Sequence, residues 1–274
     1  MNTGFEIPEY VGWIIVAAAT VAAFDIYIIR SATKKRKRTQ LLSARFDDGW
    51  KTIIEKNVPV YNKLPEELKK QLYGLMNVFL DEKKFEGCGG LEITNEIRVT
   101  VAAQACMLLL NRSTKYYPKL KRIYVYPSSY TAKDGDSTSA RLGESWLNGP
   151  VVLAWDSVKG GAVNVHDGKN VVFHEFSHRL DQEDGDADGA PILENSSCYK
   201  SWAKVLSAEY AALQDKTNRR RKSVINKYGA TNPAEFFAVA TEAFFEKTKQ
   251  MKKKQPELYE ELKGYYKVDP LEWK

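Results

Sequence analysis

The chain has 274 residues, enough for one large domain or two small ones. Apolar residues make up 43% and charged residues 28%, which suits a packed core with a soluble surface. The three cysteines, Cys88, Cys106 and Cys198, exclude a disulfide framework and a CxxC metal pair, so we expect reduced thiols, compatible with the cytoplasm. The net charge of +6 does not by itself indicate nucleic-acid binding, because residues 1–38 carry six positive and three negative side chains and so hold half of the excess.

A nearly continuous apolar segment covers residues 10–29, interrupted only by Thr20 and Asp25. Twenty helical residues with a rise of 1.5 Å each cover about 30 Å, the thickness of the hydrocarbon layer of a bilayer. Trp13 near one end and Tyr27 near the other are typical of membrane interfaces. The segment therefore predicts a transmembrane helix, and the alternative is a packing helix or hairpin of a soluble domain.

Positive residues follow the apolar segment, in the run Lys34–Arg38, and none precedes it. This order argues against a cleaved signal peptide and places the C-terminal side in the cytoplasm. Beside an apolar helix, such a run fits lipid headgroups better than nucleic acid. We therefore expect a membrane-anchored, single-pass protein with a cytoplasmic domain, divided into an N-terminal tail (1–9), a transmembrane helix (10–29), a basic juxtamembrane linker (30–40) and a folded domain (41–274).

The middle of the chain alternates helical and strand patterns. Apolar residues at helical spacing predict amphipathic helices, and one apolar segment predicts a helix buried on most of its faces. Short β-rich segments bounded by proline or glycine predict strands. In chain order we expect a helix within 41–54, a helix over 65–80, a turn at 85–91, a buried helix over 99–110, a strand at 123–126, a polar loop over 128–143 and a strand at 151–155.

The segment Val171–Asp181 contains the motif His174-Glu175-Phe176-Ser177-His178. On a helix, positions i and i+4 lie on one face, so both imidazoles can bind a single zinc ion. Glu175 then lies beside the metal without binding it, where it can take a proton from a zinc-bound water. Two of the chain's three histidines lie in this motif, so a chance match is the weaker explanation.

A catalytic zinc needs a third protein ligand and one open position. Asp184 is one candidate, at the position where metzincins place a histidine. Glu235 and Glu242 are the others, two turns apart on one face of the apolar segment 233–245, which Asn232 can cap. A carboxylate inside such a helix is costly unless it is paired or bound to a metal. Spacing alone does not choose between the two glutamates.

From about residue 41 to its C-terminus, the chain resembles the Mlc titration factor A family of zinc peptidases. The stretches that carry the resemblance cover most of the predicted domain and are Gly90-Leu91-Glu92-Ile93-Thr94, Ala102-Ala103-Gln104-Ala105-Cys106, Gly143-Glu144-Ser145-Trp146, Gly149–Trp155, and His174–Asp181 with Asp184-Gly185. The segment Tyr228–Ala238 is also similar to the zinc helix in the catalytic domain of anthrax lethal factor.

The resemblance implies an α+β fold, a zincin-like metallopeptidase domain of the M90 and gluzincin type with helices around a small mixed sheet. It also implies one zinc ion per chain. In both families the glutamate of the Ala-Glu-x-Phe run is the third zinc ligand, and a tyrosine seven residues earlier points at the metal. Here these residues are Glu235 and Tyr228. The ligands would then be His174, His178 and Glu235, with Glu242 supporting them or the fold.

These residues predict a zinc-dependent peptidase that acts on a peptide or protein substrate. Glu175 would be the general base, and Tyr228 would help to stabilise the oxyanion. The strand at 151–155 is expected at the sheet edge, where it could pair with the peptide, and the alternative is an interior strand. The loop 185–191 could gate access, and Asp181 could orient an imidazole or simply be solvated or cap the helix.

The alternative to catalysis is a zinc protein with little or no activity that binds and sequesters a partner such as a transcriptional regulator. The resemblance implies this alternative, because the namesake of the family sequesters a repressor. Nucleic acid is not an expected partner. The basic runs 219–222 and 252–254 have no aromatic stacking platform beside them, and such runs are usually solvated.

Overall fold

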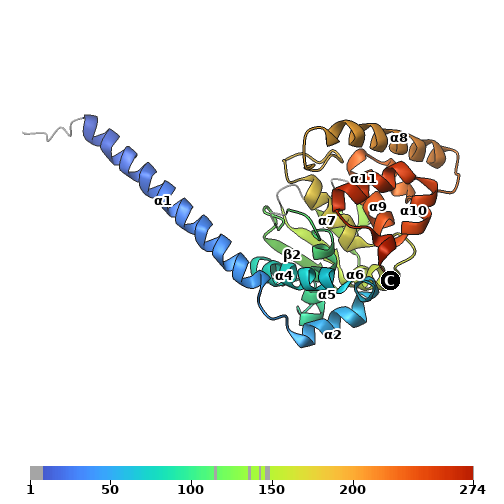
Figure 1. Cartoon of the computed structure of the whole chain (residues 1–274), viewed down its shortest axis with the longest axis horizontal. Coiled ribbons are helices and arrows are strands. Elements are labelled where there is room, and N and C mark those ends of the chain that lie inside the picture. The colour runs from blue at the N-terminus through green and yellow to red at the C-terminus, as the bar shows by residue number, and fades with distance from the viewer. Residues whose placement is uncertain (1–8, 114–115, 135–136, 142, 146–148, 274) are drawn as a thin grey trace, which may run out of the picture. The chain divides into compact units, whose positions relative to one another are not determined.

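The computed structural model describes residues 9–113, 116–134, 137–141, 143–145 and 149–273 (Figure 1). The chain divides into two compact units, Met1–Ala44 and Arg45–Lys274. Most of the predicted tail (1–9) and Trp146 of the family-like stretches lie outside the described residues. All three cysteines are free thiols.

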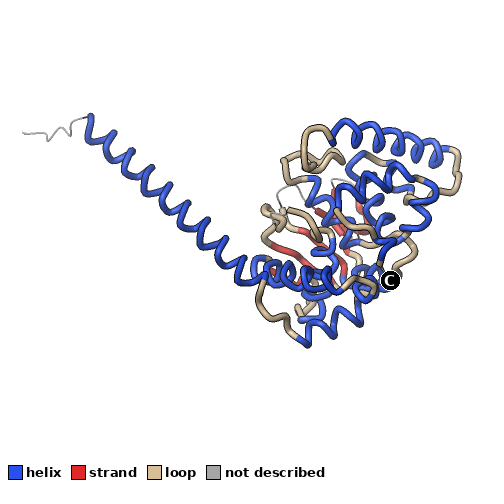
Figure 2. The backbone as a smooth tube through the Cα atoms, in the orientation of Figure 1, coloured by secondary structure: helices blue, strands red, loops and turns tan. Residues whose placement is uncertain are grey.

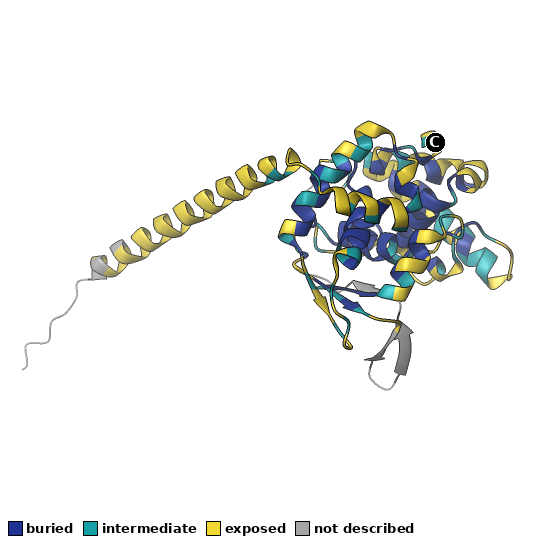
Figure 3. Ribbon diagram, turned by 90° about the horizontal axis from the view of Figure 1, so that it is seen from below, coloured by how far each residue is buried: buried dark blue, intermediate teal, exposed yellow. Residues whose placement is uncertain are grey.

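The first unit contains one long helix, α1 (Glu9–Leu42), whose described side chains are almost all exposed (Figure 3). Its part Ile15–Leu42 is long and apolar enough to cross a membrane, judged by length and composition. Residues 30–40, expected as a linker, continue the same helix. Lysine, arginine, glutamine and leucine are good helix formers, and neither glycine nor proline interrupts the chain between Trp13 and Leu42.

A small mixed sheet lies within the second unit, among its helices (Figure 2). Its strand order is β1 (Lys84–Gly87), β2 (Arg122–Tyr126), β6 (Val151–Ala154) and β5 (Gly143–Ser145). The first three strands are parallel, with Ile123 opposite Val151, and β5 pairs antiparallel with β6. All four residues of β6 are buried, as expected for a strand with neighbours on both sides.

The sheet confirms the strands predicted at 123–126 and 151–155 and corrects two other expectations. The segment 151–155 is not an edge strand, because β6 lies between β2 and β5, and it ends where a helix begins at Trp155. The turn predicted at 85–91 starts as β1, a short exposed strand whose Phe85 pairs with Ile123. Strand β1 was missed because its single apolar residue gives no alternating pattern.

The polar loop predicted at 128–143 is also wrong over most of its length. It contains an antiparallel pair, β3 (Tyr130–Asp134) and β4 (Ser137–Arg141), in which Ala132 is opposite Ser139. The glycine and aspartate at its tip, residues 135 and 136, lie outside the described part. Threonine and tyrosine favour extended backbone, but polarity and turn residues dominated the sequence pattern.

Helices make up most of the second unit and confirm the α+β fold. The predicted helices at 65–80 and 99–110 are present as α4 and α5, and α5 is buried from Val99 onward. The helices are α2 (Asp48–Asn57), α3 (Pro59–Asn62), α4 (Glu66–Glu82), α5 (Asn95–Met107), α6 (Trp155–Val163), α7 (Val171–Asp181), α8 (Cys198–Asn218), η1 (Lys227–Ala230), α9 (Pro233–Glu246), α10 (Thr248–Lys254), α11 (Pro256–Tyr266) and η2 (Pro270–Glu272).

Asn170 fixes the start of helix α7 from three directions. Its side-chain oxygen accepts hydrogen bonds from the backbone N–H groups of Val172 and Phe173, as an N-cap residue does. Its side-chain nitrogen donates to Gln104 Oε1 on α5 at 2.9 Å and to Glu246 Oε1 on α9 at 3.1 Å. The first turn of α7 is therefore held by α5 and α9, two of the helices that pack against it.

The loop after α7 is tied to the rest of the unit at Gly189. The Gly189 N–H donates to Asp181 Oδ2 at 3.0 Å, and the Gly189 carbonyl accepts from Trp202 Nε1 at 3.0 Å. Gly189 has φ +79°, and a Cβ there would lie 2.5 Å from the Pro233 carbonyl oxygen, so only glycine fits. Asp181 thus binds this loop, and its expected contact with an imidazole is not among the hydrogen bonds of the described residues. A gating role for 185–191 stays a prediction.

Candidate metal centre

Three side chains from α7 and α9 converge on one point. His174 and His178 lie one turn apart on α7, and Glu235 lies in the first turn of α9. His174 Nε2 is 3.0 Å from Glu235 Oε2 and 3.3 Å from His178 Nε2, and His178 Nε2 is 3.5 Å from Glu235 Oε2. This is the His–His–Glu group, and it could hold a metal ion.

The local sequence fixes Glu235 at this position. Asn232 is extended and caps α9, with its Oδ1 accepting from the Glu235 N–H at 2.9 Å, and Pro233 begins the helix with its preset φ. Both features were expected from the sequence. Because the cap anchors the first turn, the Glu235 side chain starts from a fixed backbone rather than a frayed helix end.

The distances among the three ligand atoms fit a small cation. Zinc bonds of 2.0–2.1 Å in tetrahedral geometry place ligand atoms about 3.3 Å apart, and the observed separations are 3.0, 3.3 and 3.5 Å. Glu235 Oε2 is buried and has no hydrogen-bond partner among the described residues when the nitrogens that face it carry no proton. Three acceptors that face each other without hydrogens repel one another unless a cation lies between them.

Glu242 decides which nitrogen of His174 faces the ligand group. Glu242 Oε1 lies 2.8 Å from His174 Nδ1, and its Oε2 accepts from the Asn170 N–H at 2.6 Å. The carboxylate can only accept, so Nδ1 carries the proton and Nε2 presents its lone pair to Glu235 and His178. The group contains neither Glu242 nor Asp184, which is exposed and binds the Asp186 N–H.

The electrostatics of the site favour positive charge. Burial alone would lower the pKa of His174. Hydrogen bonds with Glu235 and Glu242 outweigh this effect and raise the pKa well above its usual range. Burial would raise the pKa of Glu235, but hydrogen bonds from His174 and His178 lower it to about 2. The carboxylate therefore stays ionised, as a metal ligand must be.

Glu246 is a supporting residue that the sequence analysis missed. Its Oε1 accepts from the Asn170 side chain at 3.1 Å and its Oε2 accepts from the Lys169 N–H at 3.1 Å. Burial raises the pKa of the Glu246 carboxyl to about 8. Glu246 lies at the end of a helix beside Lys247, and a glutamate in that setting is usually expected to be exposed to solvent. Its spacing of four residues from Glu242, which places both side chains on one face of the helix, could have indicated its role.

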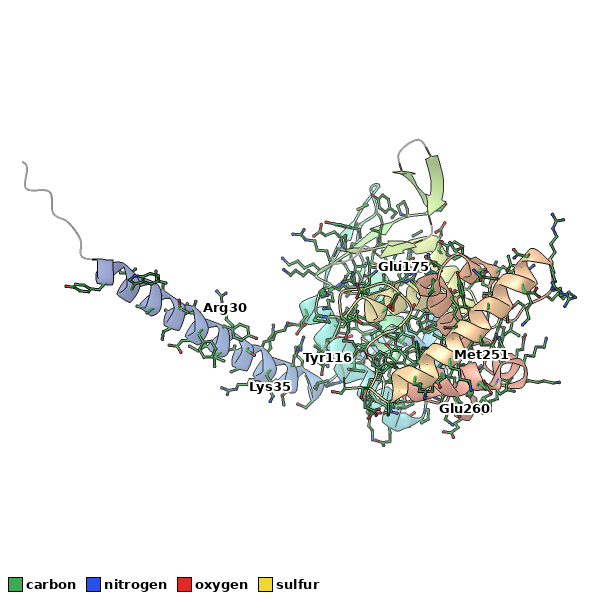
Figure 4. The ribbon with its side chains drawn as sticks, turned by 90° about the horizontal axis from the view of Figure 1, so that it is seen from above. Arg30, Lys35, Tyr116, Glu175, Met251 and Glu260 are labelled. Atoms are coloured by element: carbon green, nitrogen blue, oxygen red, sulfur yellow. The ribbon has the colours of Figure 1, made fainter. Side chains whose placement is uncertain are left out.

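Two further candidates lie close to the His–His–Glu group. Glu175 is buried in α7, inside the second unit (Figure 4), and its charge contributes to the raised pKa of His174. Tyr228 lies on η1 with its ring centroid 6.1 Å from the His174 ring, and it is 56% exposed. Its neighbour Gly229 packs against α9 so closely that a Cβ would lie 2.4 Å from Val239 Cγ2, which holds the segment in place.

Comparison with known proteins agrees with this geometry. The family described as glucose-regulated metallo-peptidase M90 matches residues 32–267. An uncharacterized protein of Synechocystis sp., slr2042, is 37% identical over 245 residues, which cover 86% of this chain and 89% of the relative. Mlc titration factor A of Klebsiella pneumoniae is 29% identical, covering 78% of this chain and 84% of the relative, and that of Escherichia coli is 26% identical, covering 79% and 85%.

The family match extends over most of the chain and includes α7 and α9, the two helices that supply the His–His–Glu group. The resemblance inferred from short stretches of sequence is thereby confirmed for the family as a whole. This chain belongs to the M90 family of metallopeptidases.

Proposed function

We propose that the chain is a zinc-dependent peptidase that hydrolyses peptide bonds, with one Zn²⁺ per chain held by His174, His178 and Glu235. The observation that carries the proposal is the set of three acceptor atoms at zinc-ligand separations on largely buried side chains, with the Nδ1 proton of His174 donated to Glu242. The M90 family to which the chain belongs is described as a metallo-peptidase family.

When bound, zinc would supply Lewis-acid chemistry, lowering the pKa of a coordinated water and polarising the scissile carbonyl. Glu175, next to His174 in α7, takes the proton of the attacking water and delivers it to the leaving amine. Glu175 is buried in α7, directly after His174 in the chain. Tyr228 is 56% exposed beside His174 and would donate its hydroxyl to the developing oxyanion.

The substrate surface in this proposal is strand β5 rather than β6. β6 is interior, so it has no free main-chain groups, whereas β5 forms the end of the described sheet and lies beside α7. An extended peptide could therefore add to β5 through main-chain hydrogen bonds and lie across the His–His–Glu group.

A protein regulator is a second partner of the same proposal. Several relatives carry the name Mlc titration factor A, and this chain shares 29% identity with one of them. The alternative function, sequestering a regulator with little or no catalysis, would need neither Glu175 nor a hydroxyl donor beside the metal, and both are present here.

We also propose that α1 anchors the protein in a membrane, with the second unit in the cytoplasm. The exposed apolar part of α1 and the basic residues that follow it on the same helix support both the insertion and the orientation.

Glu175→Gln is expected to reduce peptide cleavage about 1,000-fold while the metal stays bound, because glutamine keeps the shape of the side chain and removes the base. Digestion of a peptide library and metal analysis of the same sample measure the two effects. Glu257→Gln, on the exposed first turn of α11, is the matched control and should cleave normally. Undiminished cleavage by Glu175→Gln would overturn the mechanism.

Glu235→Ala is expected to lose the metal, because two imidazoles alone leave the ion without its anionic ligand. Glu242→Gln should retain the metal but bind it about 10–100-fold more weakly, since an amide nitrogen would face either Asn170 N–H or His174 Nδ1–H, both donors. Metal titration against a competing chelator distinguishes the two variants. Full metal occupancy in Glu235→Ala would assign the third ligand to Glu242 or Asp184 instead.

Tyr228→Phe is expected to lower kcat about 100-fold with unchanged metal content, because it removes one donor to the oxyanion and leaves the ring in place. Tyr228 is 56% exposed, so the unfolding temperature should change little. Steady-state kinetics on a cleaved library peptide provide the test. An equal kcat for the parent chain and Tyr228→Phe would show that the Tyr228 hydroxyl has no part in catalysis.

The full chain is expected to remain with membranes after alkaline washing, whereas a variant lacking residues 9–29 should be released, because the apolar part of α1 supplies the anchoring energy. Protease added to intact spheroplasts should leave the second unit uncut, and protease added after lysis should digest it. A soluble full chain would exclude the anchor, and digestion in intact spheroplasts would reverse the orientation.

A further inference from the structure

A cavity of about 620 Å³ lies at the far end of α9 from the metal centre. Glu235 and Glu246 are separated by eleven residues, or about 16 Å along the helix axis. The cavity lies between the end of α3, the loop after α6, the α9–α10 junction and the C-terminal residues around η2. None of the three candidate metal ligands lines it, so it is a separate site.

Cationic side chains dominate the polar part of the cavity. Lys63, Lys247 and Lys249 line it, and among the described residues none of the three has a carboxylate within salt-bridge distance. Lys63 and Lys249 are exposed, whereas Lys247 donates to the Val224 carbonyl at 3.3 Å. Such an excess of unpaired ammonium groups at a concave surface attracts anions.

Glu246, the one carboxylate among the described residues of the lining, does not cancel this charge. Glu246 already accepts hydrogen bonds from the Asn170 side chain and the Lys169 N–H, which direct its oxygens toward α7. The remaining titratable group in the lining, His166, is exposed and adds positive charge when protonated. The charge available to a ligand is therefore positive.

The rest of the wall is apolar and partly aromatic. Val60 and Phe245 are buried, Leu271 is 37% exposed, and Trp273 packs on Phe245 with ring centroids 5.9 Å apart. An inorganic anion would leave this apolar surface exposed to water. An aromatic or aliphatic group on the ligand would bury the surface and so contribute to binding. The volume lies in the range of small-molecule sites and is too small for a folded partner.

We propose that this cavity binds a small organic anion with an apolar body, whose acidic group lies between Lys63 and Lys249 and whose apolar part packs against Leu271 and Trp273. The chemical class is an aryl or alkyl carboxylate, sulfonate or phosphate. The inference does not depend on peptidase activity, because it rests on residues outside the His–His–Glu group.

Titration calorimetry of the full chain in non-ionic detergent with 2-naphthalenesulfonate tests this site, with the heat of the probe entering empty micelles subtracted. A sulfonate is a poor ligand for zinc, so the probe separates the cavity from the metal centre. We expect saturable binding of one molecule per chain with a Kd of about 1 mM or tighter, the strength expected for a ligand of this size. Inorganic sulfate should bind about tenfold more weakly, because it cannot use the apolar wall.

The double variant K63E/K249E should weaken binding of the probe about tenfold or more, since it replaces two attractions by two repulsions. K253E/K254E is the matched control, with the same change in net charge on exposed residues of α10 outside the cavity, and should bind like the parent chain. Leu271→Glu gives an independent variant that places a carboxylate against the apolar wall and should also abolish binding. Equal binding by K63E/K249E and the control, equal binding of sulfate and the probe, or no heat above the micelle blank would each overturn the proposal.

Discussion

The arrangement of the metal centre depends on one carboxylate. Glu242 accepts one hydrogen bond from the backbone N–H of Asn170, just before α7. It accepts a second from Nδ1–H of His174, one turn further along the chain. Burying a carboxylate costs several kcal/mol unless both oxygens find donors, and here both do. The two hydrogen bonds lock the register of α7 against α9. With that register fixed, Glu235, two turns before Glu242, faces the Nε2 atoms of His174 and His178.

Much of this centre could be predicted from the sequence, because it depends on helical periodicity. The spacing of His174 and His178 places both on one face of a helix, and Asn232 with Pro233 marks where the next helix starts. Spacing did not choose between Glu235 and Glu242, since both lie on the same face of α9. The choice depends on how far α9 slides along α7, which is a tertiary contact with no local sequence pattern.

The sheet was predicted less well, for a related reason. A buried strand such as β6 is recognisable by its apolar run, but its neighbours are not part of that run. Strand β5 has only three residues, and β3 and β4 contain mostly polar residues, with serine and threonine among them. The sequence pattern of these three strands therefore does not differ from that of a loop. Edge position is decided by which segments pair, and this is why residues 151–155 were wrongly expected at the sheet edge, which β5 occupies instead.

The three glutamates of helix α9 lie on one face of the helix but differ in their hydrogen-bond partners. Glu235, Glu242 and Glu246 are spaced by seven and four residues, which brings all three to the side of α9 that meets α7. Apart from Pro233 and Thr241, the rest of the helix is apolar and buried. Donors from His174 on α7 and from the two residues before the helix, Lys169 and Asn170, satisfy Glu242 and Glu246. Glu235 Oε2 is left facing the Nε2 atoms of the two imidazoles. A packed helix would be more stable with an apolar residue there. A bound cation would offset this cost.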